Sequence, residues 1–148
     1  MKSKRVSKRL TRNDLGETGS HQSAIHVPKR AEIIAFFPEL DESEENPSCM
    51  IDIWSAEVAR EYQLRFIHYN NRVVGSGTRD EYRLTGTRLL LRELNARSGD
   101  DLVLESGDGP SMLVSIVRGG ETIGRQAGVR ELIGGWRIEI GEMLSDEH

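Results

Sequence analysis

Apolar and polar residues alternate along several short stretches of the chain, which is the pattern of half-buried β-strands. The alternation predicts strands at Ile25–Val27, Met50–Trp54, Tyr62–Tyr69, Asp101–Glu105, Met112–Val117 and Trp136–Ile140. The last is the clearest, because Trp136 and Ile138 enclose the charged Arg137. The stretch 9–22 is polar and rich in glycine and turn formers, so it predicts a short strand that runs into an exposed arm.

Two segments have the spacing of helices instead. Pro28 favours a helix that continues through Phe37 and ends at Pro38. Thr87 is a suitable N-cap for a second helix, Arg88–Ala96, whose core residues would be Leu89, Leu90, Leu91 and Leu94. Six to eight short strands with two short helices predict a mainly β, α+β domain built around a barrel-like sheet.

A row of charged side chains follows from the same alternation at Thr78–Thr85. Residues two apart in a strand point to one side, so Arg79, Glu81 and Arg83 share a face, and Asp80 and Tyr82 lie on the other. Arginine pairs with guanine and a carboxylate accepts from the cytosine amino group, so the row is suited to reading G·C pairs from a strand in the major groove. A surface ladder of ion pairs is the alternative interpretation.

The net charge of the 148 residues is −4, which taken alone argues against a nucleic-acid partner. The charges are segregated, however. Residues 1–30 hold eight bases and two acids, residues 31–59 eight acids and no base, and residues 60–97 eight bases and four acids. Every base after Lys29 is arginine, which recognises phosphate and guanine through two hydrogen bonds at once. We expect the two basic blocks to form a cleft, with the acidic loop 39–46 and the C-terminal strands facing away from it.

The polar arm is a second candidate for DNA contact, because it holds bases suited to phosphates and polar groups suited to base edges. The bases are Lys8, Arg9 and Arg12, and the polar groups are Asn13, Asp14, His21 and Gln22. A plain solvated loop is the alternative. The glycines do not make a nucleotide-binding P-loop, since no Gly-Lys-Ser/Thr follows them.

Catalytic and metal sites find little support in the sequence. The single cysteine, Cys49, excludes an internal disulfide framework, and His21 and His26 lack the spacing of a zinc site. Asp52 with Glu61 matches only a loose nuclease pattern, and no lysine accompanies them. We therefore expect no catalytic residue, metal or cofactor. No stretch has the apolar length of a membrane span, which predicts a cytoplasmic protein without a membrane partner.

Several segments, taken in order, resemble one family. They are Arg9–Gln22, Ile25–Pro28, Phe37–Leu40, Arg65–Asn71 and Gly77–Thr85, with the Gly-Asp turn of Ser98–Val103. Over about residues 8–140 the chain is similar to the N-terminal effector domain of EcoRII-type restriction endonucleases, a DNA-binding pseudobarrel related to the plant B-three transcription-factor domains.

The resemblance implies a seven-stranded open pseudobarrel with two arms in the major groove. The N-arm falls on Lys8–Ala24 and the C-arm on Gly77–Thr85. Base-reading positions fall on Arg79, Asp80, Glu81, Tyr82 and Arg83 and on Asn13, Asp14, His21 and Gln22. Backbone contacts fall on Lys8, Arg9, Arg12, Thr18, Ser20, His26, Asn70, Asn71, Arg72 and Thr78. Two positions depart from the family pattern: Tyr82 stands where a base is expected, and His26 where an aromatic ring is expected.

The implied function is sequence-specific binding of double-stranded DNA by the effector domain of a type IIE restriction endonuclease, on a G·C-rich site such as CCWGG. Its partners would be DNA and a catalytic nuclease domain of the full-length protein, and Mg²⁺ would belong to that domain alone. Residues 1–24 would form a basic N-terminal strand and the DNA-binding arm, 25–140 the body with the C-arm, and 141–148 an acidic tail or linker stub, in a monomeric domain. The rival interpretations are a free-standing transcriptional regulator, a metal-dependent nuclease within this chain, and a barrel that binds a small ligand or a protein.

Overall fold

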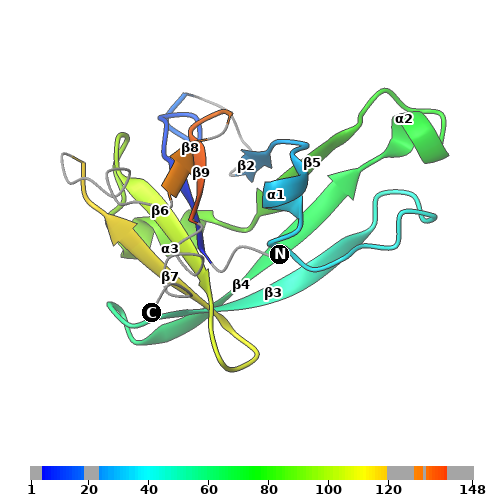
Figure 1. Cartoon of the computed structure of the whole chain (residues 1–148). Coiled ribbons are helices and arrows are strands. Elements are labelled where there is room, and N and C mark those ends of the chain that lie inside the picture. The colour runs from blue at the N-terminus through cyan, green and yellow to red at the C-terminus, as the bar shows by residue number, and fades with distance from the viewer. Residues whose placement is uncertain (1–4, 19–23, 120–128, 132, 140–148) are drawn as a thin grey trace.

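Nine strands form a single curved sheet in the computed structural model of the chain, which describes residues 5–18, 24–119, 129–131 and 133–139 (Figure 1). They are β1 (Arg5–Arg9), β2 (Ala24–Val27), β3 (Ser48–Ser55), β4 (Arg60–Tyr69), β5 (Glu81–Thr85), β6 (Asp101–Ser106), β7 (Met112–Val117), β8 (Val129–Glu131) and β9 (Trp136–Glu139). Their order across the sheet is β2-β5-β4-β3-β7-β6-β1-β9-β8. β3 and β7 are parallel, and the other neighbours are antiparallel. The predicted mainly β fold is confirmed, with nine strands in the described residues where seven were expected.

Three short helices connect the strands in the described residues: α1 (Ala31–Ile34), α2 (Asn71–Val74) and α3 (Arg88–Glu93). α1 is shorter than predicted because the chain up to Phe37 continues in tighter turns, in which amides bond three residues back. α3 ends early because Asn95 has a φ of 55°, which a right-handed helix cannot continue. α2 was not predicted from the sequence. Leu89, expected in the core, is 36% exposed, since three consecutive leucines cannot all face one side of a helix.

The core is built from alternate residues of the strands. On β4, Tyr62, Leu64 and Phe66 are buried, and the residues between them are exposed. Phe37 from the turn after α1 stacks on Phe66 with ring centroids 4.5 Å apart. Burying a side chain of this size stabilises the fold by about 1.5–3 kcal/mol. The face of β4 that carries Phe66 is therefore fixed inward, whereas the opposite face carries the exposed Gln63 and Arg65 together with Ile67, which is only 8% exposed.

The barrel is closed by a contact between strands that are not neighbours in the sheet. Trp136 of β9 is 1% exposed, and its indole N–H donates to the backbone oxygen of His26 on β2 over 3.0 Å. The same indole packs edge-on against Phe37, with centroids 6.3 Å apart. β2 is the edge strand at one end of the sheet, whereas β9 is next to the other edge. This contact, which we call the seam, joins the two ends of the open sheet.

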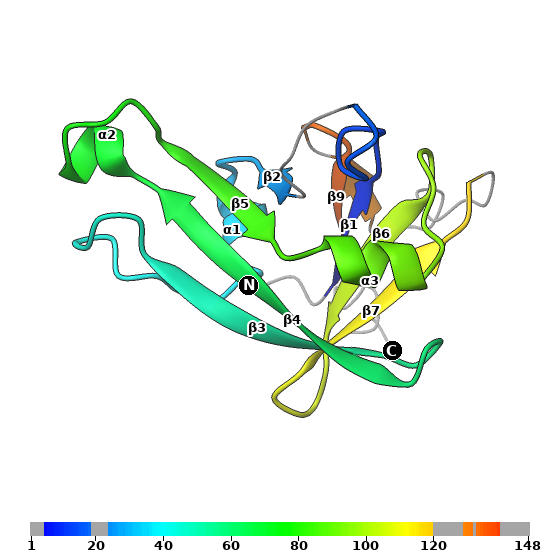
Figure 2. The same cartoon turned by 180° about the vertical axis from the view of Figure 1, so that it is seen from behind.

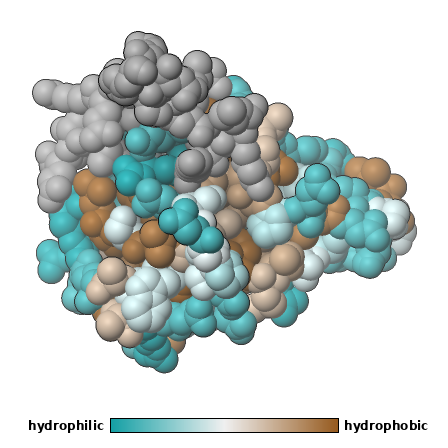
Figure 3. All heavy atoms as spheres, turned by 60° about the horizontal axis from the view of Figure 1, so that its bottom comes forward, coloured by the Kyte–Doolittle hydropathy of each residue, from teal (hydrophilic) through white to brown (hydrophobic). Residues whose placement is uncertain are grey.

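Two projections rise at the same end of the molecule (Figures 1 and 2). One is the loop 10–18 after β1, which contains the described part of the N-arm. The other is an extension formed by the ends of β4 and β5 with α2 at its tip, and it contains the C-arm (Figure 2). Apolar side chains gather at the far end of this extension beyond hydrophilic ones (Figure 3), where Val73 is 69% and Val74 40% exposed. The fold thus directs both predicted arms to the same end of the molecule (Figures 1 and 2).

Candidate nucleic-acid interface

The predicted row of Arg79, Glu81 and Arg83 exists as one connected unit. Glu81 accepts from Arg79 Nε over 3.1 Å and from Arg83 Nε over 2.8 Å, one with each carboxylate oxygen. Burial raises the pKa of Glu81, but the hydrogen bonds from Arg83 and Arg79 outweigh it and hold that pKa below its ordinary value. Glu81 is therefore ionised at neutral pH. The same contacts form a ladder of ion pairs, which was the alternative interpretation. The geometry of the free chain therefore agrees with a row suited to G·C pairs and with an ion-pair ladder.

Arg79 is held from two directions although it precedes β5. Its backbone N–H donates to Asn71 Oδ1 over 2.8 Å, and its carbonyl accepts from the amide of Arg72 over 2.9 Å. Its guanidinium lies over the ring of Tyr69, 3.7 Å from the centroid, in cation–π contact. The contacts from α2 and β4 fix the direction of this arginine before any ligand is present.

Asp80 points to the opposite face, where its carboxylate binds side chains from three other segments of the chain. Its carboxylate is in contact with Lys29 Nζ at 2.6 Å, His68 Nε2 at 2.8 Å and Arg72 Nη2 at 3.1 Å. The hydrogen bond from Lys29, and after it that from His68, hold the pKa of Asp80 well below its ordinary value. The assignment of Asp80 to base reading is corrected: its acceptor oxygens are occupied within the fold, and its role is to anchor the C-arm.

Tyr82 lies on the same reverse face and is also corrected from a base reader to a packing residue. Its ring stacks on His68 at 3.9 Å and on Phe66 at 5.6 Å between centroids. Its hydroxyl donates to Glu42 over 3.2 Å, and Glu42 also contacts His68. Burial, together with the nearby Glu42 charge, raises the pKa of Tyr82 to about 12. The alternation at 79–83 had already placed this residue behind the row.

The residues at the tip of the extension have mostly internal partners. Asn70 is 1% exposed, and its side chain bonds the backbone at Asn46 and Glu44, so it is not available to a phosphate and that assignment is corrected. Asn71 accepts from Arg79, as described above. Arg72 pairs with Asp80 but is exposed, as is Thr78, so both keep surface for a backbone contact.

Two predicted DNA contacts of the N-arm lie beneath the surface. Lys8 and Asp14 are 6% and 5% exposed, and their charged groups meet at 2.6 Å. Asp14 also accepts from the amide of Thr11 over 2.9 Å, which closes the turn at the base of the arm. Lys8 as a phosphate contact and Asp14 as a base contact are therefore corrected to a buried ion pair that shapes the arm.

The other described arm residues remain at the surface. Arg9 and Arg12 are exposed, with Arg9 Nε 2.9 Å from Asp101 and Arg12 Nε 3.8 Å from Glu17. Asn13 is exposed and accepts from the hydroxyl of Thr18 over 2.8 Å. Ser20, His21 and Gln22 lie outside the described residues, so their predicted contacts stay predictions.

The outward face of β4 adds residues that the sequence analysis did not assign. In register, Arg65 lies opposite Thr85, Ile67 opposite Arg83 and Tyr69 opposite Glu81. His26 of β2 lies opposite Arg83 on its other side and is exposed. The signal was present in the alternation of Leu64, Phe66 and His68 with these outward residues. The row is thus the middle of a three-stranded face that includes His26 and Arg65.

The predicted segregation of charge holds only in part. The acidic loop contacts the reverse face through Glu42, as predicted for a segment that faces away from the row. The C-terminal strands, however, neutralise the arm strand: Arg5 pairs with Glu105 and Glu139, and Arg9 with Asp101. The expectation that these acids face away from the first basic block is wrong, because β1 lies between β6 and β9 in the sheet.

The loose nuclease pattern does not assemble into a site. Asp52 accepts from Gln63 over 2.9 Å and Glu61 from Ser111 over 2.8 Å. Within the described ranges, no group of three or more His, Cys, Asp or Glu side chains is placed to hold a metal ion. The helices of the same ranges are all too short or too polar to cross a membrane.

These features define the class of fold, which is an open pseudobarrel with two arms beside a polar three-stranded face. A solved chain described as the Arabidopsis FUS3–DNA complex has this fold, with a TM-score of 0.58 and 15% identity, over 77% of this chain and 96% of that one. The family is set by sequence. The model described as "Restriction endonuclease EcoRII, N-terminal" matches residues 2–104, and the chain belongs to that family. This confirms the resemblance found in the sequence.

A curated relative gives the scale of the match. The type II restriction enzyme EcoRII of Escherichia coli is 36% identical to this chain over 80 residues. The alignment covers 53% of this chain and 19% of that enzyme. The similarity is therefore confined to a small part of the relative.

Proposed function

We propose that this chain binds double-stranded DNA sequence-specifically, as the effector domain of a type IIE restriction endonuclease, and that it reads a G·C-rich site such as CCWGG. The observation that carries the proposal is the row Arg79–Glu81–Arg83, whose hydrogen-bonded side chains are partly exposed on β5 and just before it. Family membership supports it, as does the fold shared with a chain whose title names a DNA complex.

The ion pairs of the row suit it to DNA reading rather than to stability alone. Partly exposed ion pairs contribute about 0–1 kcal/mol to folding, so the fold gains little from three such side chains. Arg79 and Arg83 each bind Glu81 through Nε, which leaves the terminal guanidinium nitrogens for guanine O6 and N7. Glu81 can accept from a cytosine amino group once an arginine turns to its guanine. The row is thus prearranged for adjacent G·C pairs.

The surface residues of the arms would complete the interface. The sugar–phosphate backbone would be contacted by Arg9, Arg12, Arg72, Thr78 and His26, and a base edge by Asn13. Lys8, Asp14, Asn70, Asp80 and Tyr82 act behind the surface by fixing the arms. Catalysis and its Mg²⁺ would belong to a separate nuclease domain. DNA binding by this chain would control the cleavage that the nuclease domain carries out.

Selection of bound duplexes from a random pool tests the proposal. We expect a G·C-rich consensus, and affinity for it should fall steeply with salt because phosphate contacts release counterions. Arg83→Ala should cost about 1–3 kcal/mol on the selected site and much less on random DNA. Arg30→Ala is the matched control, because Arg30 is an exposed arginine just before α1 that belongs neither to the row nor to the N-arm.

Two outcomes would contradict the proposal. If Arg83→Ala lost equal binding free energy on selected and on random DNA, the row would contact only the sugar–phosphate backbone. Cleavage of DNA by this chain with Mg²⁺, lost in Asp52→Asn or Glu61→Gln, would favour the nuclease interpretation instead.

A further inference from the structure

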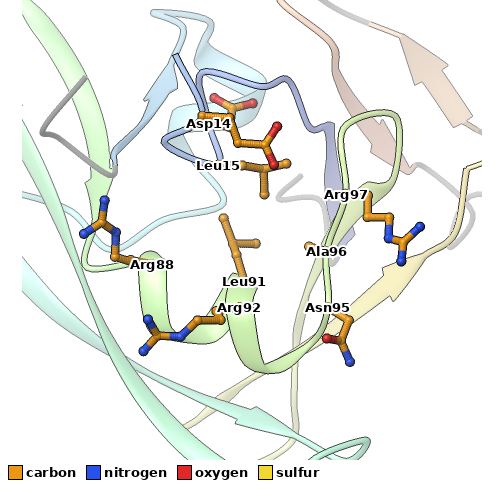
Figure 4. Close-up of a pocket in the computed structure, with 9 residues that line it drawn as sticks. Asp14, Leu15, Arg88, Leu91, Arg92, Asn95, Ala96 and Arg97 are labelled. Atoms are coloured by element: carbon orange, nitrogen blue, oxygen red, sulfur yellow. The ribbon is translucent and has the colours of Figure 1, made fainter. Parts of the chain in front are cut away.

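A shallow pocket of about 380 Å³ lies between the N-arm and α3 (Figure 4). Leu15 from the arm, Leu91 from α3 and Ala96 after it make the pocket apolar at its centre, and Figure 4 shows the side chains of Leu15 and Leu91 directed toward one another. The rim on the α3 side carries three arginines, Arg88, Arg92 and Arg97. Neither the core nor the row uses these arginines.

Among the described residues the three arginines have no salt bridge, although the hydrogen bond from Tyr62 and, to a lesser extent, the charge of Arg92 lower the pKa of the neighbouring Glu93. Arg88 and Arg92 are four residues apart on α3, so their like charges are neighbours, which disfavours a helix. Over the described ranges, Arg88, Arg92 and Arg97 form no ion pair. Three acids are close by. Asp14 is bound to Lys8, Glu17 is 3.8 Å from Arg12, and Glu93 is held by Arg60 and Tyr62.

The arginines also face away from the pocket. Figure 4 shows the guanidinium groups of Arg88, Arg92 and Arg97 directed outward from its centre. All three residues are exposed. A small anion held in the pocket would need these groups turned inward, whereas an extended polyanion outside it would meet all three. The apolar stems of the arginines can rest on the pocket wall meanwhile.

We propose that Arg88, Arg92 and Arg97 form a second phosphate-binding surface, which lies against the sugar–phosphate backbone of duplex DNA beside the N-arm. This inference rests on the proposed function. Two placements support DNA as the occupant. The N-arm lines the same pocket through Leu15 and Glu17, and α3 follows the end of β5 away from α2 after only Gly86 and Thr87, so the surface stands beside the N-arm and beside the strand that carries the row (Figure 2).

The charge-removing variant Arg88→Gln/Arg92→Gln tests this surface. Affinity for the selected duplex and for random DNA should fall together, by about tenfold or more at low salt, and the salt slope should fall by about two. The ratio of the two affinities should stay unchanged, because phosphate contacts carry no sequence information. Arg88→Lys/Arg92→Lys should keep the salt slope, since a point charge suffices for a phosphate.

Arg30→Gln is the matched control for charge removal, and urea denaturation checks that each variant folds. A salt slope unchanged in the double variant, with a steep wild-type slope, overturns the inference and leaves the proposed function intact; the surface would then fit an acidic protein segment. A wild-type chain without salt-dependent DNA binding overturns both. A loss confined to the selected duplex overturns the inference as well, because it would mean base reading.

Discussion

The side of β5 that a residue occupies separates two groups of polar side chains. All five residues at 79–83 are polar and half-buried. Arg79, Glu81 and Arg83 bond one another on one side, and Asp80 and Tyr82 contact Lys29, His68 and Phe66 on the other. The alternation alone was sufficient to predict this division. It could not show that the carboxylate of Asp80 would already be occupied by Lys29, His68 and Arg72, because those partners come from distant segments.

The buried pair of Lys8 and Asp14 is the clearest single-residue departure from the sequence prediction. A lysine in a polar arm is predicted to be exposed. In the fold, the loop 10–18 turns back and brings Asp14 against Lys8, which is buried. Removing one partner of a buried pair leaves an uncompensated charge, so Asp14→Ala should destabilise the fold by about 3–5 kcal/mol. Urea denaturation measures the loss.

The apolar double variant Lys8→Met/Asp14→Leu separates charge from packing. It should recover much of the stability, because well-packed apolar residues replace buried pairs at little cost. A loss for Asp14→Ala below about 1 kcal/mol would instead indicate a solvated pair.

Among the elements, β5 depends most on what lies behind it. The ring of Tyr82 packs on His68 and Phe66, and its hydroxyl bonds Glu42 of the acidic loop. The loop therefore supports the C-arm from the reverse side. The sequence analysis predicted the loop only as a solvated surface, because its acidic composition does not show that one glutamate docks on the sheet.

This docking predicts a dependence of stability on alkaline pH. The pKa of Tyr82 is raised to about 12 in the fold, whereas an unfolded tyrosine ionises near pH 10. Between these values the unfolded chain loses the proton first, so the free energy of unfolding should fall as the pH rises from about 10 to 12. The contribution is fully present below pH 10.

Ultraviolet titration of the folded chain measures this directly. The wild type should show a phenol that ionises near pH 12, and Tyr82→Phe should lack it. The free energy of unfolding of the variant should fall less steeply over the same range. Identical titration curves for the two proteins would contradict the assignment.

At the scale of the whole molecule, the open sheet depends on the seam between β9 and β2. Local patterns predicted both strands, since Trp136 and Ile138 alternate with charged residues. They did not predict β8, and they could not show that the indole N–H of Trp136 meets His26, because that contact joins residues 110 positions apart.

The hydrogen bond of the seam should contribute to the stability of the fold. Trp136→Phe keeps an aromatic ring but leaves the carbonyl of His26 without its donor, which should cost about 1–3 kcal/mol in unfolding free energy, with some loss of packing added. Trp54→Phe is the matched control, because Trp54 is 39% exposed on β3 and should change stability by less than about 0.5 kcal/mol. Urea denaturation measures the free energy of unfolding of both variants. Equal losses of this free energy would show that the indole hydrogen bond contributes nothing to stability.

The position of the seam has a mechanical consequence for the N-arm. The arm leaves the sheet from β1, which is beside β9, and returns to it at β2, so its two attachment points stand on opposite sides of the closure. Because the seam joins β9 to β2, it also sets the distance between these two attachment points. A substitution at the seam, far from any arginine of the row, would change that distance.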